Sequence, residues 1–180
     1  MTYNRPTKLS YLHIQVNGYL LNKLKSIYNK SAINKKELSD VLGLSTKSVS
    51  NKMSSGKLSI KHIKLGTTMQ STILFPIVAV AEYLTEYWFT HNHEGTNCNT
   101  FLDIEVSEYL LNELYTKYKN DNLSKSELAH ELSISAKTLS NRIFLGSFSI
   151  RYIRTKGVIK FPIIAIAEFL TKELYISATY

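Results

Sequence analysis

The strongest constraint on the fold of this chain is an internal repeat. Residues 44–51 have the sequence LSTKSVSN, and residues 134–141 have the sequence ISAKTLSN. At the same offset, YLHIQVNGYLLNKLKSIY matches FLDIEVSEYLLNELYTKY. After a shorter loop in the second copy, LFPIVAVAEYLTE matches KFPIIAIAEFLTK. A long repeat that occurs only twice predicts two small domains in tandem and argues against a solenoid, which needs at least three stacked units.

The repeat boundaries define the predicted domains. We expect an N-terminal tail at residues 1–9, a first domain at 10–88, a linker at 89–99 and a second domain at 100–175. The polar composition of the middle segment is typical of a linker. It contains His91, His93 and Cys98, but three candidate ligands without a fixed fourth do not predict a metal site. We therefore expect no metal and no other cofactor.

Composition is typical of a globular chain. The 180 residues are 44% hydrophobic and 20% charged, which is enough for one large core or two small ones. No apolar run approaches the roughly 20 residues that a membrane span needs, and the N-terminal residues lack the apolar block of a signal peptide. The single cysteine cannot form an internal disulfide. A cytoplasmic protein without membrane contact is the expectation.

The charge balance favours a polyanionic partner. Lys and Arg number 22 against 14 Asp and Glu, giving a net charge of +8. Residues 1–90 hold 12 of these bases and 4 acids, whereas residues 91–180 hold 10 of each. In the second half, however, the acids cluster before the segment that matches LSTKSVSN, and the segment itself carries only bases. Each Lys or Arg that neutralises a phosphate releases a counterion, so both halves are suited to binding nucleic acid.

Periodicity predicts the first elements of each copy. The alternating segments LHIQV and LDIEV predict short half-buried strands. A helix follows, with Asn17 or Ser107 as its N-cap. Its inward residues are expected at helical spacing: Tyr19, Leu20, Leu24 and Tyr28, or Tyr109, Leu110, Leu114 and Tyr118.

Two shorter helices are expected next. The first covers residues 35–42, or 125–132 in the second copy. Gly43 follows where a tight turn needs a residue tolerant of positive φ, and Ser133 replaces it in the second copy. The second helix is expected to bury the apolar positions that follow its N-cap: Val49 and Met53, or Leu139 and Ile143.

This spacing resembles the helix-turn-helix of bacterial repressors. The segment ELSDVLGLSTKSVSNKM departs from that pattern at Ser39, where a small Ala is usual, and the second copy has Ala129 there. The resemblance implies that the second helix of each pair enters the major groove of DNA. With the apolar positions buried, the polar positions lie on the opposite face. The expected DNA-binding residues are Ser45, Thr46, Lys47, Ser50, Asn51 and Lys52 in the first copy, and Ser135, Ala136, Lys137, Ser140, Asn141 and Arg142 in the second.

The next segment predicts a β-hairpin with one apolar edge and one cationic edge. Ile60, Ile63 and Leu65 alternate with basic residues. Such a hairpin is typical of the wing that contacts the DNA backbone in winged helix-turn-helix proteins. His62 and Tyr152 share a matched position, where groove contact and a structural role are both open. The expected backbone-contacting residues are Lys57, Lys61, Lys64, Arg151, Arg154, Lys156 and Lys160.

Each copy closes with Phe-Pro and an apolar helix, in which Pro suits the first turn. The order of helix-turn-helix, basic hairpin, FP and a helix ending in EYL or EFL resembles the excisionase, AlpA-like and MerR-like group of winged regulators of phages and mobile elements. The resemblance implies a mainly α fold with small β wings, here as two tandem winged helix-turn-helix domains. Those proteins usually have one such domain and lack the added strand and helix. The closing helix is apolar nearly all round, which predicts packing against the other copy; packing against a second chain, in a homo-oligomer, is the alternative.

Three functions compete at this point. The first is a sequence-specific regulator that binds double-stranded DNA at two half-sites, arranged as a direct or an imperfect inverted repeat. The second is an architectural, replication-origin or plasmid-partition protein that assembles on repeated DNA sites. The third is an enzyme, but the sequence has no paired carboxylates with basic partners, no metal cluster and no Gly-rich phosphate loop. The expectation is a protein without catalytic residues.

Overall fold

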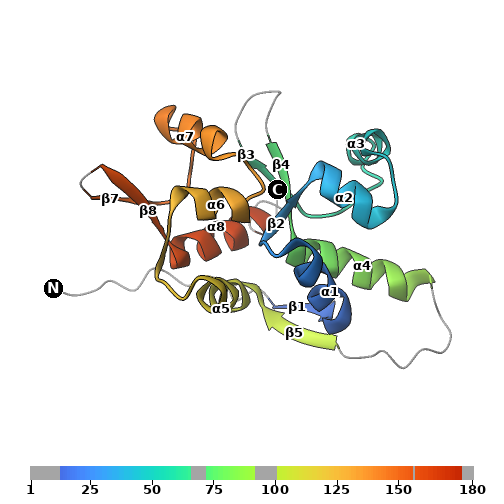
Figure 1. Ribbon diagram of the computed structural model, residues 1–180. Helices are drawn as coiled ribbons and strands as arrows, with labels where there is room; N and C mark the ends of the chain where they lie inside the picture. The colour runs from blue at the N-terminus through green and yellow to red at the C-terminus, as the bar shows by residue number, and fades with distance from the viewer. Residues whose placement is uncertain (1–12, 66–71, 92–100, 156, 176–180) are drawn as a thin grey trace.

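The computed structural model describes residues 13–65, 72–91, 101–155 and 157–175. The predicted N-terminal tail, most of the predicted linker with His93 and Cys98, and Lys156 lie outside these ranges. Within them the chain is mainly helical with small antiparallel sheets, as expected from the sequence (Figure 1).

The same order of elements occurs twice. The first repeat contains β1 (His13–Asn17), α1 (Gly18–Tyr28), β2 (Ala32–Asn34), α2 (Lys35–Leu42), α3 (Thr46–Ser54), β3 (Ile63–Leu65), β4 (Thr72–Pro76) and α4 (Ile77–His91). The second repeat contains β5 (Phe101–Glu105), α5 (Val106–Tyr118), β6 (Asn122–Leu123), α6 (Lys125–Glu131), α7 (Ala136–Phe144), β7 (Ile153–Thr155), β8 (Val158–Pro162) and α8 (Ile163–Tyr175). Because α4 continues to His91, the helix extends past the predicted domain end at residue 88.

The two long N-terminal helices begin differently. Asn17 caps α1 as predicted, since its Oδ1 accepts from the backbone N–H of Leu20 at 3.1 Å. The predicted cap Ser107 is wrong, because α5 begins one residue earlier, at Val106, and Ser107 lies inside the helix. Glu105 occupies the N-cap position without a side-chain cap bond. Val106 is fully buried, so core packing sets the start of α5.

The turn between the two short helices follows the prediction. Gly43 has φ +62° and closes α2, which begins with a capping box of Asn34 and Glu37. Ser133 adopts φ +51° at the matched position. Its hydroxyl donates to the backbone carbonyl of Ala32 in the first repeat, at 2.7 Å, and this bond compensates for a conformation that serine rarely adopts.

Each repeat holds a small three-stranded sheet. The strand orders are β2-β4-β3 and β6-β8-β7, and all pairs are antiparallel. The outer strands β2 and β6 were not predicted, because three and two residues are too short to show a periodic pattern. The central strands bury Phe75 and Phe161 completely, so each sheet is fixed to the helices by an aromatic side chain at its centre.

The two repeats form one body with a shared core. Strand β1 pairs with β5, and Ile14 stands opposite Ile104, its own equivalent in the repeat. The buried apolar side chains of both repeats belong to a single cluster. Helix α8 contacts β3 of the first repeat, as predicted for the closing helix. Figure 1 shows the first repeat on the right, the second on the left, and β3 and β4 between them.

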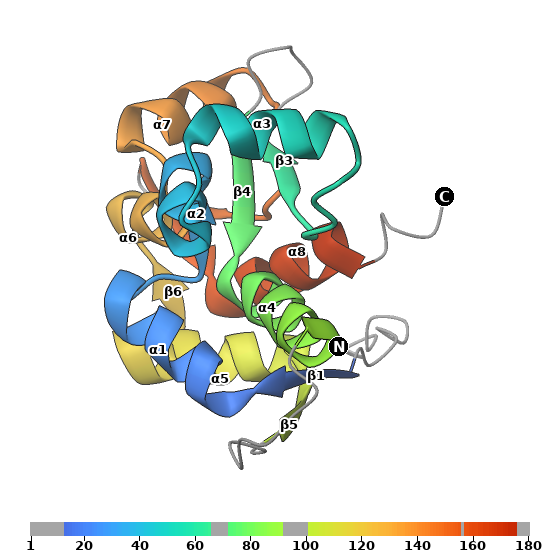
Figure 2. The same ribbon diagram turned by 90° about the vertical axis from the view of Figure 1, so that its right-hand side faces the viewer.

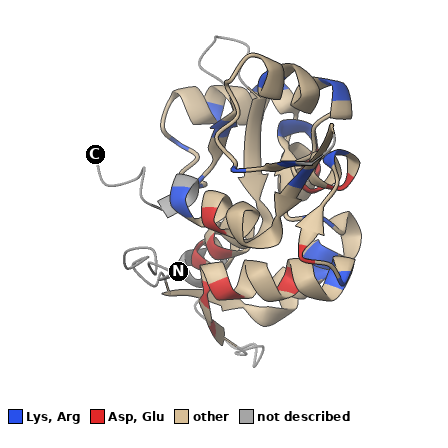
Figure 3. Ribbon diagram, turned by 90° about the vertical axis from the view of Figure 1, so that its left-hand side faces the viewer, with Lys and Arg blue, Asp and Glu red and all other residues tan. Residues whose placement is uncertain are grey.

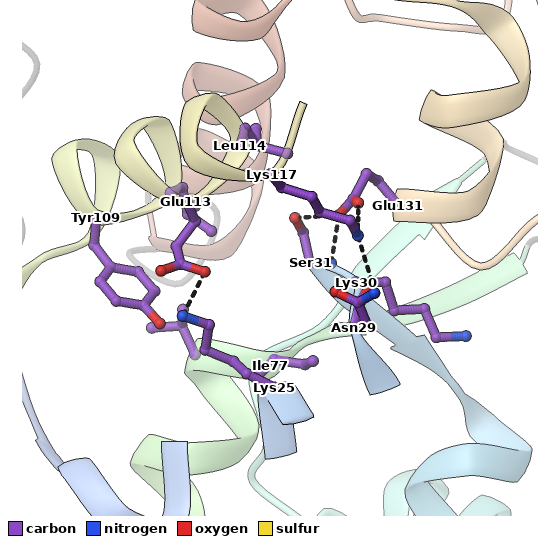
Figure 4. Close-up of a pocket in the computed structure, with 12 residues that line it drawn as sticks. Lys25, Asn29, Lys30, Ser31, Ile77, Tyr109, Glu113, Leu114, Lys117 and Glu131 are labelled. Carbon is purple, nitrogen blue, oxygen red and sulfur yellow. Dashed lines mark hydrogen bonds and ion pairs between the residues drawn. The ribbon is translucent and has the colours of Figure 1, made fainter. Parts of the chain in front are cut away.

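A polar network fixes this contact between repeats. Glu131 is 1% exposed and accepts from the backbone N–H and the hydroxyl of Ser31, at 2.7 and 2.6 Å. Lys117 donates to Glu131 and to the carbonyl of Asn29, as Figure 4 shows. Burial alone would raise the pKa of Glu131, but the hydrogen bonds from Lys117, Ser31 and Tyr118 hold it below its ordinary value.

Candidate nucleic-acid interface

Helices α3 and α7 lie at the same end of the molecule. In Figures 1 and 2 both occupy the top, whereas β1 and β5 lie at the bottom. Each follows its partner helix, α2 or α6, through the left-handed turn at Gly43 or Ser133. The fold therefore presents the two predicted recognition helices on one side.

The sequence of α3 explains why one of its faces is free. Ser45 caps the helix by accepting from the backbone N–H of Ser48 at 3.1 Å. Val49 is fully buried and Met53 partly so. Four of the predicted DNA-binding residues are exposed, namely Thr46, Lys47, Asn51 and Lys52. Lys47 and Asn51 lie on the face opposite Val49. The hydroxyl of Thr46 lies 3.3 Å from that of Ser39 in α2.

Helix α7 repeats this arrangement. Ser135 accepts from the backbone N–H of Thr138 at 3.0 Å, and Leu139 is fully buried. Ala136, Lys137 and Asn141 are exposed at the positions of Thr46, Lys47 and Asn51. The structure thus brings a matched Lys and Asn to the same face of both helices.

Four of the predicted serines already serve the helices themselves. The hydroxyls of Ser45 and Ser135 are the N-caps. Ser50 donates to the carbonyl of Thr46 at 3.0 Å, and Ser140 donates to that of Ala136 at 2.8 Å. The oxygens of Ser50 and Ser140 remain able to accept a hydrogen bond, but their protons are used within the helix.

Arg142 and Lys52 share a position but not a role. Lys52 is exposed. Arg142 is half-buried and donates to the Thr72 hydroxyl of the first repeat at 3.2 Å, and burial lowers its pKa. Arg142 therefore joins the two repeats, a role that the sequence pattern did not indicate.

The wing cations divide into two groups. Lys64 and Arg154 are exposed and stand opposite Ile73 and Ile159 in the hairpin registers. Lys57, after α3, is also exposed. By contrast, Lys61 pairs with Glu82 at 2.9 Å.

The second repeat shows the same division. Arg151 pairs with Glu168 at the position that matches the Lys61–Glu82 pair. Lys160 stands opposite Ile153 and so lies on the other face of the hairpin from Arg154. Among the described wing cations, Lys64 and Arg154 are exposed at matched positions of the two hairpins.

His62 and Tyr152 have structural roles in the hairpins. The His62 ring lies 5.8 Å from the Phe75 ring, and the Tyr152 ring lies 6.0 Å from the Phe161 ring. Each thus contacts the central aromatic residue of its own sheet. Of the two roles left open by the sequence, these contacts favour the structural one.

The segments that form the candidate interface carry basic residues and no acidic ones. The sequence has no Asp or Glu between Asp40 and Glu82, and none between Glu131 and Glu168. These two acid-free segments contain α3, α7 and both basic hairpins. Figure 3 shows Lys and Arg along the upper part of the molecule and most Asp and Glu in the lower half. The end that carries α3 and α7 therefore attracts anions.

Two apolar side chains at the end of α7 were missed. Phe144 is 89% exposed and Leu145 is 72% exposed, whereas Ser54 and Ser55 occupy the matched positions. Phe144 and Leu145 follow the inward residue Ile143 and fall outside the helical spacing of the inward residues. This departure is the signal that could have identified them. They extend the exposed surface of α7 with apolar area.

A comparison of the chain with protein-family models, curated proteins and solved structures finds no match in any of the three. Over the described ranges, no helix has the length and apolar character needed to cross a membrane. The same ranges contain no cluster of three or more His, Cys, Asp or Glu side chains arranged to hold a metal ion.

Proposed function

We propose that this protein binds double-stranded DNA sequence-specifically, as two tandem winged helix-turn-helix units, and regulates transcription on a phage or mobile element. The observation that carries the proposal is the matched pair of exposed residues, Lys47 with Asn51 and Lys137 with Asn141, on two capped helices at one end of the molecule. Both helices lie in segments of the chain without Asp or Glu.

The chemistry of these side chains suits base recognition. An Asn amide can bond two edges of adenine, and a Lys ammonium can reach guanine or a phosphate. Lys64 and Arg154 are exposed at matched positions of the two hairpins, opposite Ile73 and Ile159, and would contact the DNA backbone. Backbone contacts position the protein, and the helices then select the sequence.

The packing of the repeats supports a direct repeat of half-sites. A two-fold axis would give equivalent residues equal exposure, and this condition is not met. Ile63 is 1% exposed and its equivalent Ile153 is 51% exposed; Val78 is 1% exposed and its equivalent Ile164 is 55% exposed. The β1–β5 pair is locally symmetric, with Ile14 opposite its equivalent Ile104, but the rest of the contact is head to tail, because the second repeat covers the hairpin of the first. Two reading helices related in this way are suited to half-sites of the same orientation.

Equilibrium binding to a selected duplex, followed by fluorescence anisotropy, tests the proposal. The variant Lys47→Ala/Asn51→Ala should lose at least tenfold in affinity, because it removes base and phosphate contacts. Lys172→Ala is the matched control, since it removes an exposed cation from α8, away from α3 and α7. Equal effects of the two variants would refute the proposed reading surface.

Assembly on repeated DNA sites is a second candidate function. It is favoured by the exposed apolar side chains of the second hairpin, among them Ile153 and Val158, at 51% and 57%. DNase footprinting separates the two candidates. A single bounded footprint supports a regulator, and protection that spreads along an array of half-sites supports assembly.

A further inference from the structure

The second repeat covers one side of the first. In the first repeat Ile63, Leu74 and Val78 are at most 1% exposed. Helix α8 contacts β3, Arg142 bonds to Thr72 at the start of β4, and Val78 lines a pocket together with Tyr109 and other residues of α5. The apolar face of the first hairpin and the start of α4 are therefore buried by the second repeat.

The same side of the second repeat has no cover within the described chain. The residues at the positions of His62, Ile63, Thr72 and Val78 are all exposed. They are Tyr152 at 40%, Ile153 at 51%, Val158 at 57% and Ile164 at 55%, and we call them the wing patch. The register pairs Ile153 with Lys160 and Thr155 with Val158, so Ile153 and Val158 share one face of the hairpin.

The part of the contact that lies on α1 and the start of α4 is formed by one stripe of α5. Tyr109, Glu113 and Lys117 follow each other at intervals of one helical turn. The ammonium of Lys25 lies 5.2 Å from the centre of the Tyr109 ring and pairs with Glu113, and Lys117 donates to the Asn29 carbonyl. Figure 4 shows these side chains directed toward the first repeat.

The equivalent stripe of α1 is exposed. It consists of Tyr19 at 65%, Lys23 and Ile27 at 60%, and we call it the helix patch. Tyr19 was predicted to face inward, and this prediction is wrong. On α5, the equivalent of the helix patch contacts the first repeat, whereas the helix patch itself is exposed. In the first repeat, the equivalents of the wing patch are covered by the second repeat, whereas the wing patch itself is exposed.

We propose that two copies of this chain associate head to tail, with the wing patch of one chain against the helix patch of the next. The contact within the chain is itself the argument for this occupant: α5 meets α1 and Val78, while α8 meets β3 and Arg142 meets Thr72. The equivalents of the α5 stripe and of Arg142, namely the helix patch and Lys52, are exposed on the first repeat. When two chains associate through unlike surfaces, one wing patch and one helix patch of the pair stay exposed. Further chains can therefore add until a ring closes or a filament forms.

The contact between chains differs from the internal one in two respects. It lacks an equivalent of the β1–β5 strand pair, which is made within each chain, so it is weaker and depends on concentration. Its charges also differ: Ile27 and Val41 take the places of Lys117 and Glu131, and Lys23 and Lys160 take those of Glu113 and Leu74. Because the added charges are both positive, salt should not weaken this contact, in contrast to DNA binding.

Sedimentation velocity of the full chain without DNA, over a wide range of protein concentrations, tests the proposal. The wild type should form species that grow beyond a dimer. Ile153→Asp and Ile27→Asp each replace an exposed side chain and should each yield monomers. Mixing the two variants should restore association, but only to a dimer, since one intact wing patch then meets one intact helix patch.

The controls separate this contact from other surfaces. Leu145→Asp changes an exposed apolar residue outside both patches and should leave association unchanged. Val158→Asp provides a second variant of the wing patch should Ile153→Asp fail to fold, as judged by circular dichroism. A monomeric wild type, or a mixture of the two variants that stays monomeric, would overturn the proposal. Since DNA is absent, either result leaves the DNA-binding proposal unaffected.

Discussion

Lys61 donates to both carboxylate oxygens of Glu82 at 2.9 Å, and Arg151 pairs with Glu168 at the matched position of the second repeat. Both pairs join a hairpin to the closing helix of its own repeat. The charge of these two bases is thus balanced within the protein, whereas Lys64 and Arg154 extend from the hairpins into solvent. Neighbouring cations of one wing are therefore expected to differ in function.

Salt dependence measures this difference. Lys64→Ala and Arg154→Ala should each weaken binding to all duplexes alike and reduce the slope of log K against log salt by about one. Lys61→Ala, the matched control, should leave the slope nearly unchanged because its charge is already paired. Binding isotherms at several salt concentrations provide the measurement. A slope that falls equally for Lys61→Ala would show that the Glu82 pair opens on DNA.

Replacement of the matched asparagines should affect sequence preference. Asn51→Ala or Asn141→Ala should cost roughly 1–3 kcal/mol on the preferred site and relax base choice at one position, because we propose that each amide contacts one base pair. Competition binding against single-base variants of the site measures this. Asn112→Ala, an exposed asparagine on α5, is the control. An unchanged preference in both variants would mean that other residues read the bases.

Glu131 should make stability depend on pH. Its pKa in the folded chain lies below the ordinary value of 4.5, so the unfolded chain binds more protons in the window between the two values. Its stabilisation is fully present above about 4.5 and is lost as the pH falls through the folded pKa. Glu131→Gln should lower the free energy of unfolding by about 2 kcal/mol at neutral pH, and the difference from wild type should narrow in acid.

Denaturant unfolding at several pH values checks this prediction. Glu113→Gln is a suitable comparison, because Glu113 also pairs with a lysine across the repeats but its side chain is 38% exposed. A smaller loss at neutral pH is expected for it. If Glu131→Gln lost the same free energy at every pH, the network around Ser31 and Lys117 would not depend on the charge of Glu131.

Local features of the fold were predictable because nearby residues determine them. The caps Asn17, Ser45 and Ser135 and the positive φ of Gly43 follow from residue type and spacing. Val49 and Leu139 were correctly placed in the core by helical periodicity. The candidate reading face follows from the same periodicity, since it is the face opposite these two residues.

The relation between the repeats could not be predicted from the sequence. Nearly identical residues have different environments in the two copies, as Tyr19 and Tyr109 show, because only one side of each repeat meets the other. The role of Arg142 depends on Thr72, far away in the chain. Alignment of the copies treats such pairs as equivalent, and only the packed structure distinguishes them.

Selection of binding sites from random duplexes, at two salt concentrations, tests whether both helices read DNA. Two similar half-sites in the same orientation, about one helical turn apart, should be enriched. One half-site should lose its preference in Asn51→Ala and the other in Asn141→Ala. Selection of no common sequence, or of half-sites in inverted orientation, would contradict this expectation.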